Sequence, residues 1–403
     1  MKILLLHNKL PYPPNDGGAI AVLNSSVEMA RQGHEVTLFV MNTLKHYFPV
    51  NEIPDEYHKL INIIAVDVDA SIKPIPMLIN FLFSSKPYHT VRFNSDNYRN
   101  KLINLLKENT YDMVLFEGLY VLPYEKIVRT YSKAFLVYRA HNIEHEIWER
   151  AAKNEKKLLT KFYLMNLAHR IYKTEKKLVQ KADLLLTLTA RDEAQFKRIG
   201  YKKISYVSQA GIDLHSIHVN RFSIQYPSIF FIGALDWIPN QEGLLWFIRH
   251  IWPNILLKLP DLKFEVAGRN APRWLVNKIE ECQQVVYHGE VADSHEFMSQ
   301  RAVMVVPLFS GSGMRIKIVE GMALGKSIVT TSIGTEGIPT THNRNILIAD
   351  SADKFQNEVI RLLSDKPLFD SIGINAHQFI YTHYNIETIV KDTMQFIQKV
   401  ISI

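Results

Sequence analysis

The stretch GSGMRIKIVEGMALGKSIVTT, residues 311–331, contains in one short segment the pattern that repeats along the chain. Three small residues are followed by good helix formers as far as Gly325, and a strand-like apolar run comes next. Ser312 suits the N-cap of the predicted helix, and Gly325 suits the left-handed position after a last helical turn. A loop, a helix and a strand in close succession are typical of a parallel α/β sheet.

The N-terminus of this predicted helix is a natural place for a phosphate group, because it presents free N–H groups and the positive end of the helix dipole. Arg315 and Lys317 add two positive charges in the first turn. Glu320 follows about 12 Å beyond Ser312 and leans back toward the N-terminus. We therefore predict two cations that hold a diphosphate and a carboxylate that binds sugar hydroxyls. The alternative is a surface helix with a Lys317–Glu320 salt bridge.

Length and composition predict an ordinary globular protein with two domains. The chain has 403 residues, of which 47% are hydrophobic and 22% are charged. The single Cys282 excludes an internal disulfide framework and fits a reducing compartment. The apolar run at residues 3–6 suits a first strand better than a signal peptide, and the run at 75–83 is too short to span a membrane.

The net charge of +7 is concentrated in the first half. Residues 1–204 hold 30 Lys and Arg against 21 Asp and Glu, and residues 150–181 alone hold ten basic residues against two acidic ones. This basic segment is either a solvated helix face or a contact with an anionic membrane or lipid-linked substrate. No nucleic-acid motif accompanies it, so we do not expect a nucleic-acid partner. The expected location is cytoplasmic, with the inner face of the membrane as the alternative.

Strand-like apolar runs alternate with helix-period segments along the chain, which predicts parallel sheets with crossover helices. In the first half, the predicted strands are residues 2–7, 35–41, 62–66, 112–116, 134–138 and 183–188. In the second half, they are residues 229–232, 263–266, 285–287, 303–306, 327–330 and 345–348. The restart after residue 213 predicts two Rossmann-like domains, 1–204 and 205–373, followed by a helical segment, 374–403, that packs back on the first domain.

Ligands of such sheets bind beyond the carboxyl ends of the strands, so the loops there are the candidate site. Gly17 and Gly18 stand at a helix start and allow close approach of a phosphate or sugar; a flexible turn is the alternative. The G-x-G-x-x-G turn of dinucleotide-binding enzymes is absent from this loop, which argues against a nicotinamide dehydrogenase.

His141 follows directly after a predicted buried strand and could take part in proton or hydroxyl chemistry, unless it is a structural core histidine. Residues 141–145 also spell H-x-x-E-H, the inverted zinc-protease pattern, but they start in a strand–helix turn, which argues against that interpretation. The D-x-D triplet at 67–69 could be read as a metal site, but such triplets are common by chance.

Three loops of the second half should meet the helix of residues 311–325 at one edge of its sheet. They contain Gly233, Arg269, and Gly289 with Val291. Each loop follows a predicted strand, so their side chains and backbone groups converge where a nucleotide would lie.

With these residues assembled, the chain resembles glycosyltransferases of the GT-B fold, and in particular the retaining family 4, or group 1. The resemblance is carried by Gly17-Gly18, His141, residues 210–213, the Gly233 loop and, above all, residues 320–326. It implies two facing Rossmann-like domains, a nucleoside-diphosphate-sugar donor, retention of anomeric configuration and no essential metal or other cofactor.

The resemblance also assigns roles to residues. Glu320 matches the second Glu of the family's E-x7-E element and would bind the ribose, whereas Ser312 stands where the first Glu is expected. The usual basic pair of the Gly233 loop is missing, and Arg315 and Lys317 would replace it. The predicted catalytic residues are His141, Arg315 and Lys317, and the predicted donor-binding residues are Gly17, Gly18, Gly233, Arg269, Gly289, Val291, Ser312, Gly313, Met314 and Glu320.

The sequence therefore predicts transfer of a sugar to a glycan or lipid-linked acceptor in polysaccharide or cell-envelope glycan synthesis. Two alternatives remain open. One is a nucleotide-sugar epimerase of the same two-domain build, and the other is a non-catalytic protein that keeps the nucleotide pocket, which the missing carboxylate at Ser312 makes conceivable.

Overall fold

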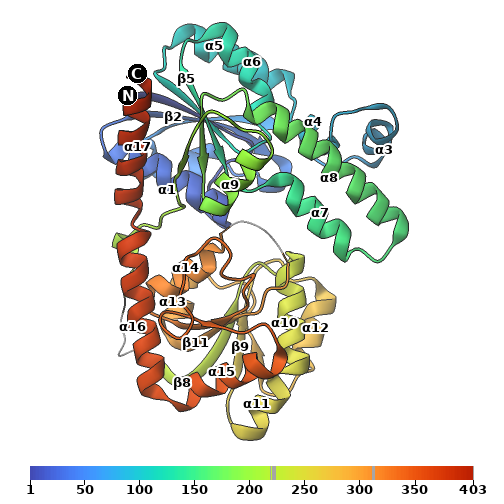
Figure 1. Cartoon of the computed structure of the whole chain (residues 1–403), viewed down its shortest axis with the longest axis vertical. Coiled ribbons are helices and arrows are strands. Elements are labelled where there is room, and N and C mark those ends of the chain that lie inside the picture. Colours follow the sequence, from blue (N-terminus) through green and yellow to red (C-terminus); the bar gives the residue numbers. More distant parts are fainter. Residues whose placement is uncertain (218, 220–223, 311–313, 403) are drawn as a thin grey trace. The chain divides into compact units, whose positions relative to one another are not determined.

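The computed structural model describes residues 1–217, 219, 224–310 and 314–402. The chain forms two compact units. The first domain combines Met1–Gly211 with Ile386–Ile403, and the second domain is Ile212–Asn385 (Figure 1). Both domains are parallel α/β sheets with helices on each face, as the alternating pattern predicts.

The first domain is built on a seven-stranded parallel sheet with the order β3-β2-β1-β4-β5-β6-β7. Its strands are β1 (Lys2–His7), β2 (Glu35–Thr43), β3 (Asn62–Val68), β4 (Met113–Glu117), β5 (Phe135–Ala140), β6 (Leu184–Thr187) and β7 (Ile204–Val207). The central strands are buried along almost their whole length, which explains why they read as continuous apolar runs.

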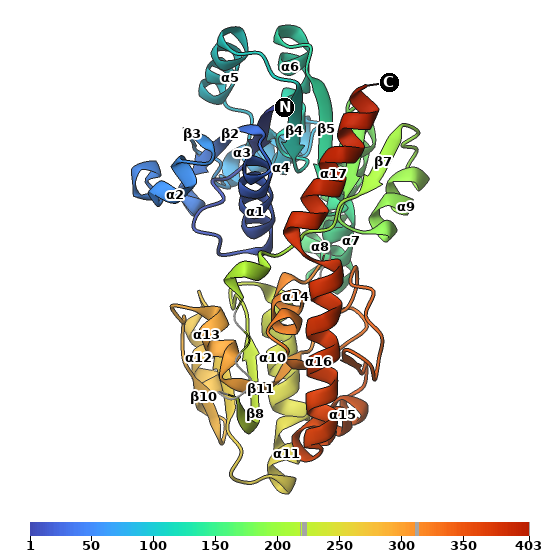
Figure 2. The ribbon, with the colours of Figure 1, turned by 90° about the vertical axis from the view of Figure 1, so that its left-hand side faces the viewer.

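Helices cover both faces of the first sheet. They are α1 (Gly17–Arg31), α2 (Asp55–His58), α3 (Pro74–Phe83), α4 (Tyr88–Val91), α5 (Asp96–Glu108), α6 (Glu125–Tyr131), α7 (Glu144–Asn154), α8 (Leu158–Val179), α9 (Ala190–Arg198) and α17 (Ile386–Ile401). On one face α17 lies beside α1 (Figure 2), and both contribute to the same core cluster. The predicted return of a C-terminal helix to the first domain is therefore confirmed for α17.

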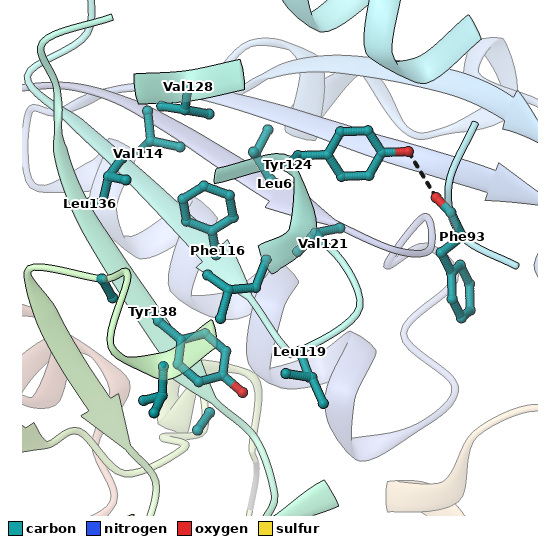
Figure 3. Close-up of a cluster of buried hydrophobic side chains, with 14 of the residues drawn as sticks. Leu6, Phe93, Val114, Phe116, Leu119, Val121, Tyr124, Val128, Leu136 and Tyr138 are labelled. Carbon is teal, nitrogen blue, oxygen red and sulfur yellow. Dashed lines mark hydrogen bonds between the residues drawn. The ribbon is translucent and has the colours of Figure 1, made fainter. Parts of the chain in front are cut away.

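The other face carries a second core cluster, in which α5, α6, α8 and α9 pack on the sheet. Figure 3 shows Phe116 of β4 and Tyr138 of β5 in this layer. The Tyr124 hydroxyl, at the rim of the same cluster, donates a hydrogen bond of 2.8 Å to the carbonyl of Phe93 (Figure 3). A buried phenol thus keeps a polar partner while its ring fills the core.

The second domain has a six-stranded parallel sheet with the order β10-β9-β8-β11-β12-β13. Its strands are β8 (Gln225–Ile232), β9 (Phe264–Ala267), β10 (Val285–Tyr287), β11 (Arg301–Val306), β12 (Ser327–Thr330) and β13 (Leu347–Ile348). Its helices are α10 (Ile238–His250), α11 (Trp252–Lys258), α12 (Arg273–Glu280), α13 (Ser294–Ser299), α14 (Ile316–Ala323), α15 (Ala352–Ser364) and α16 (Lys366–His383). One core cluster packs α10, α11 and α15 on the sheet, and another packs α13, α14 and α16.

The chain divides at residues 211 and 385, whereas the sequence placed the boundaries at 204 and 373. Two features explain the difference. β7 pairs with β6 and completes the first sheet, although the sequence did not indicate this strand. The predicted helical segment 374–403 is two helices, of which α16 packs on α14 in the second domain and α17 belongs to the first.

The helix of the opening stretch starts later than predicted. α14 begins at Ile316, so the N-cap position belongs to Arg315 and not to Ser312. Ser312 and Gly313 lie outside the described residues. The predicted end is confirmed, because Gly325 has a φ of 67°, in the left-handed region.

Candidate active site

In the first domain, charged side chains meet at the carboxyl ends of three adjacent strands, β1, β4 and β5. His141, just after β5, lies with its Nε2 2.7 Å from Oε2 of Glu117, the last residue of β4. Glu117 is completely buried, and Oε1 of its carboxylate lies 3.5 Å from Nη1 of Arg139. His7, at the end of β1, places its ring 6.2 Å from that of His141.

The charges of this cluster are balanced internally. Burial by itself would raise the pKa of Glu117, but Arg139 and His141 outweigh it and hold that pKa below its usual value. Burial, with Lys9 and His141 nearby, lowers the pKa of His7 to about 3, so this imidazole is neutral at pH 7. A buried carboxylate therefore faces one arginine and the ring of His141, which it orients through a short hydrogen bond.

The two adjacent glycines begin α1, as predicted. Asp16 is the N-cap residue, and its Oδ1 accepts hydrogen bonds of 3.0 Å from the N–H groups of Gly18 and Ala19. Lys9 forms an ion pair with the same carboxylate. Donor binding at Gly17 and Gly18 stays a prediction, but the N–H of Gly18 already has a partner within the protein.

In the second domain, Lys317 of α14 reaches back to the end of β8. Its Nζ donates a hydrogen bond of 2.7 Å to Oδ1 of Asn240 and lies 4.7 Å from the ring centre of Phe231. Burial and the nearby charge of Arg315 lower the pKa of Lys317 to about 7. Among the described residues, no carboxylate lies within ion-pair distance of this amine.

Gly233, directly after β8, makes this approach sterically feasible. A Cβ atom at Gly233 would lie 2.8 Å from Nδ2 of Asn240 and 3.1 Å from Nζ of Lys317. A side chain at this position would force one or both of these groups to shift. The structure thus brings together two residues that the sequence singled out, Gly233 and Lys317, with Asn240 as a partner that it did not assign.

Arg315 is buried at the start of α14, and its guanidinium lies 5.8 Å from the ring centre of Trp237. The side chains of Arg315 and Lys317 therefore both reach the residues that follow β8, one along Trp237 and the other to Asn240. Two cations at one junction between a strand and a helix start create a positive potential there.

Glu320 lies on the next turn of α14 and is paired across to α13. Its Oε1 is 3.7 Å from Nε2 of His295. The interaction with the carboxylate of Glu320 raises the pKa of His295, against the opposing effect of burial. Because Lys317 bonds to Asn240 and Glu320 pairs with His295, the Lys317–Glu320 salt bridge considered from the sequence is not formed.

The other predicted loops are tied to this edge by backbone hydrogen bonds. The N–H of Leu235 donates to the carbonyl of Arg269 at 2.8 Å, and the N–H of Gly268 donates to the carbonyl of Gly289 at 2.8 Å. The loops after β8, β9 and β10 therefore converge as expected. Val291 and Met314 pack against the core cluster around α14, so their side chains support the loops.

The H-x-x-E-H pattern has a different explanation in the structure. His141 bonds to Glu117, whereas Nδ1 of His145 lies 2.5 Å from Oε2 of the buried Glu175 on α8. The two histidines are thus held by separate carboxylates, which is not the shared arrangement of a zinc site.

Glu117, Asn240 and His295 were missed by the sequence analysis. Glu117 could have been found, because it ends an apolar strand at the same sheet edge as His141. Asn240 and His295 carry no comparable local signal, since their partners Lys317 and Glu320 lie far away in the sequence.

Comparison with known proteins agrees with this geometry. Residues 226–365, most of the second domain, match the family model described as Glycosyl transferases group 1. Sucrose-phosphate synthase from Thermosynechococcus elongatus superposes with a TM-score of 0.75 at 15% identity, covering 100% of each chain. Anabaena HepE in complex with UDP gives a TM-score of 0.70 at 14% identity, covering 99% of this chain and 100% of its own.

The fold and the second domain together define the class. The chain has the GT-B fold, and its resemblance to group 1 glycosyltransferases is confirmed for the second domain. A curated relative, described as an uncharacterized 44.6 kDa protein in the cps region of Klebsiella pneumoniae, is 23% identical over 402 residues, with 95% of this chain and 96% of the relative covered.

Proposed function

We propose that this protein is a glycosyltransferase that moves a hexose or deoxyhexose from a nucleoside-diphosphate donor to a glycan or lipid-linked acceptor. The observation that carries the proposal is the positive junction at β8 and α14, where the amine of Lys317 has no carboxylate partner among the described residues. An anionic ligand would supply the missing negative charge. The group 1 match over residues 226–365 supports a glycosyl donor as that ligand.

The junction would act on the leaving group. Departure of a nucleoside diphosphate develops negative charge on its phosphate oxygens, and fixed cations stabilise that charge more in the transition state than in the ground state. With a pKa of about 7, Lys317 is only partly protonated before the donor binds. A bound diphosphate would raise that pKa and keep the amine charged while the bond to the sugar breaks.

The nucleotide would lie along α14, with Glu320 accepting hydrogen bonds from the ribose hydroxyls. We propose uridine diphosphate as the first nucleotide to test, because HepE was solved with UDP and with UDP-glucose. An E. coli protein with a TM-score of 0.63 was solved with UDP-2-fluoro glucose. Retention of configuration is part of the proposal and follows from the resemblance alone.

The first domain would bind the acceptor near the cluster of His7, Glu117 and His141. In this proposal, His141 contacts the transferred sugar or the attacking hydroxyl, and Glu117 is a positioning residue that fixes the orientation of the imidazole. The cps region of the Klebsiella relative fits a role in polysaccharide synthesis. A cytoplasmic location fits the single Cys282.

One experiment separates this function from its two alternatives. The protein is incubated with UDP-, GDP- and TDP-sugars in the absence of acceptor, and the products are analysed by chromatography. A transferase slowly hydrolyses one donor to the nucleoside diphosphate and free sugar. An epimerase instead converts one nucleotide-sugar into its isomer, and a non-catalytic binding protein retains a nucleotide without changing it. Either of the last two results would reject the proposal.

A further inference from the structure

Helix α3 (Pro74–Phe83) presents an apolar face to the solvent. Its sequence, PIPMLINFLF, contains no charged residue. Five large apolar side chains on it are between 54% and 83% exposed: Ile75, Leu78, Ile79, Leu82 and Phe83. Their spacing of i, i+3, i+4, i+7 and i+8 places them on one face. A surface helix normally packs such a face against the protein core, whereas this face of α3 is exposed to solvent.

The start of α8 extends the same surface. Four of its apolar side chains are between 56% and 89% exposed: Leu158, Leu159, Phe162 and Met165. The ring centre of Phe81 on α3 lies 6.4 Å from that of Phe162. Arg170 of α8 fixes the two helices together, since it donates hydrogen bonds to the carbonyls of Asn80 and Phe81 at 3.1 and 2.7 Å. We name these nine exposed side chains of α3 and α8 the apolar ridge.

Basic residues flank the two helices of the apolar ridge in the sequence. Lys156 and Lys157 are exposed directly before Leu158, and the segment 150–181 carries ten basic residues against two acidic ones. Lys86 is exposed after the end of α3, and Lys73, exposed just before its start, is ion-paired with Asp69 at 2.8 Å. The surface thus combines large apolar groups with a positive border, which is the pattern of a helix that lies in a membrane interface.

We propose that the apolar ridge docks on the surface of a lipid bilayer that contains anionic lipids. The nine side chains would enter the boundary between headgroups and acyl chains, while the lysines meet the anionic headgroups. A second copy of this chain fits less well, because two ridges face to face would bring two positive borders together. No helix in the described part of the chain is long and apolar enough to cross a membrane. The proposal rests only on α3 and α8, and it holds whether or not the transferase reaction is correct.

The test is co-sedimentation of the full-length protein with vesicles of phosphatidylcholine plus phosphatidylglycerol. The parent should bind at low salt. The double variants Leu78→Ser/Leu82→Ser and Leu159→Ser/Phe162→Ser should each lower the partition coefficient by about tenfold or more, because each removes two apolar groups from the interface. These side chains are exposed, so the fold should be retained. Leu257→Ser is the matched control, since Leu257 is 84% exposed on α11 of the second domain.

A second pair of variants tests the charge. Lys156→Gln/Lys157→Gln should lower binding to the anionic vesicles by about tenfold. Lys258→Gln/Lys354→Gln, which removes two exposed lysines of the second domain, should leave it unchanged. Equal binding of parent and ridge variants would overturn the proposal. A dimer in sedimentation velocity that the ridge variants dissociate would overturn it too, because a second copy would then cover the ridge.

Discussion

The carboxyl edges of the two sheets both carry ionisable groups shielded from solvent, but their charges are balanced differently. In the first domain, the carboxylate of Glu117 faces Arg139 and His141, while His7 is held neutral by burial. In the second domain, Lys317 bonds only to neutral oxygen atoms of the described residues, and Arg315 lies nearby. A balanced cluster suits uncharged hydroxyl groups, whereas an excess of positive charge favours an anion. This contrast supports the proposal that the acceptor binds at the first edge and the diphosphate at the second.

The strongest test of this contrast is Lys317→Met, which removes the charge and keeps most of the volume. We expect the transfer rate to fall by about a hundredfold to a thousandfold, as for removal of a group that stabilises transition-state charge. Binding of uridine, which has no phosphate, should hardly change when measured by calorimetry. Lys263→Met, at an exposed position of the same domain, is the control. If uridine binding falls as much as the rate, Lys317 supports the fold and does not serve the diphosphate.

At the edge of the first-domain sheet, loss of the charge of Glu117 should lower the free energy of unfolding. Glu117→Gln leaves Arg139 buried without its carboxylate, and breaking such a pair costs about 3 kcal/mol of unfolding free energy. Urea unfolding of the full chain measures this loss, and Glu108→Gln at an exposed site of α5 is the control. Uridine binding in the second domain should be unaffected. If the variant has the same free energy of unfolding as the parent, the carboxylate of Glu117 is not needed to stabilise the buried Arg139.

The central strands were predictable from sequence because they are short apolar runs buried on both faces of a parallel sheet. Twelve predicted strands are present, and the missed strand β7 reads ISYV with partly exposed residues at a sheet edge. The start of α14 was misplaced because Ser312 is a good cap by local preference alone. The local signal did not indicate that the helix begins at Ile316.

The candidate site was only half predictable. Lys317 and Glu320 could be singled out as candidates because their spacing on one helix is a local property. Their partners Asn240 and His295 come from other elements and depend on tertiary packing. The apolar run in α3 was visible in the sequence, but a run of this kind is usually buried, and only the structure shows its face exposed.

The different balance of the two edges should also appear in the pH dependence of nucleotide binding. The amine of Lys317 has a pKa of about 7 in the free protein, and a diphosphate would raise it. The protonated amine is the form that binds, so affinity for UDP should fall as pH rises above 7, by up to about tenfold per unit. Calorimetry between pH 7 and 9 measures this slope. The affinity of Lys317→Met for UDP should not show this pH dependence. If the variant keeps the same slope, a group other than Lys317 causes it.

Glu320 gives a further test of the second-domain edge, because it is an acidic side chain on α14, close in sequence to Arg315 and Lys317. Glu320→Ala should weaken UDP binding by about tenfold through loss of hydrogen bonds to a carboxylate. It should also lower the pKa of His295, which NMR titration can follow in the same variant. Glu296→Ala, an exposed neighbour on α13, is the control. An unchanged dissociation constant together with a shifted His295 would place Glu320 outside the nucleotide site.

The smallest expected effect concerns metal ions. Many enzymes that release a diphosphate use a divalent cation to neutralise it. Here Arg315 and, once a bound diphosphate has raised its pKa, Lys317 would carry two positive charges on side chains that the fold already holds at the junction of β8 and α14. Transfer should therefore proceed at an unchanged rate after treatment with EDTA, and Mg²⁺ should not restore the rate of Lys317→Met. A loss of activity in EDTA that Mg²⁺ reverses would mean that the two side chains do not neutralise the leaving group by themselves, and the contrast between the two edges would then no longer explain the chemistry.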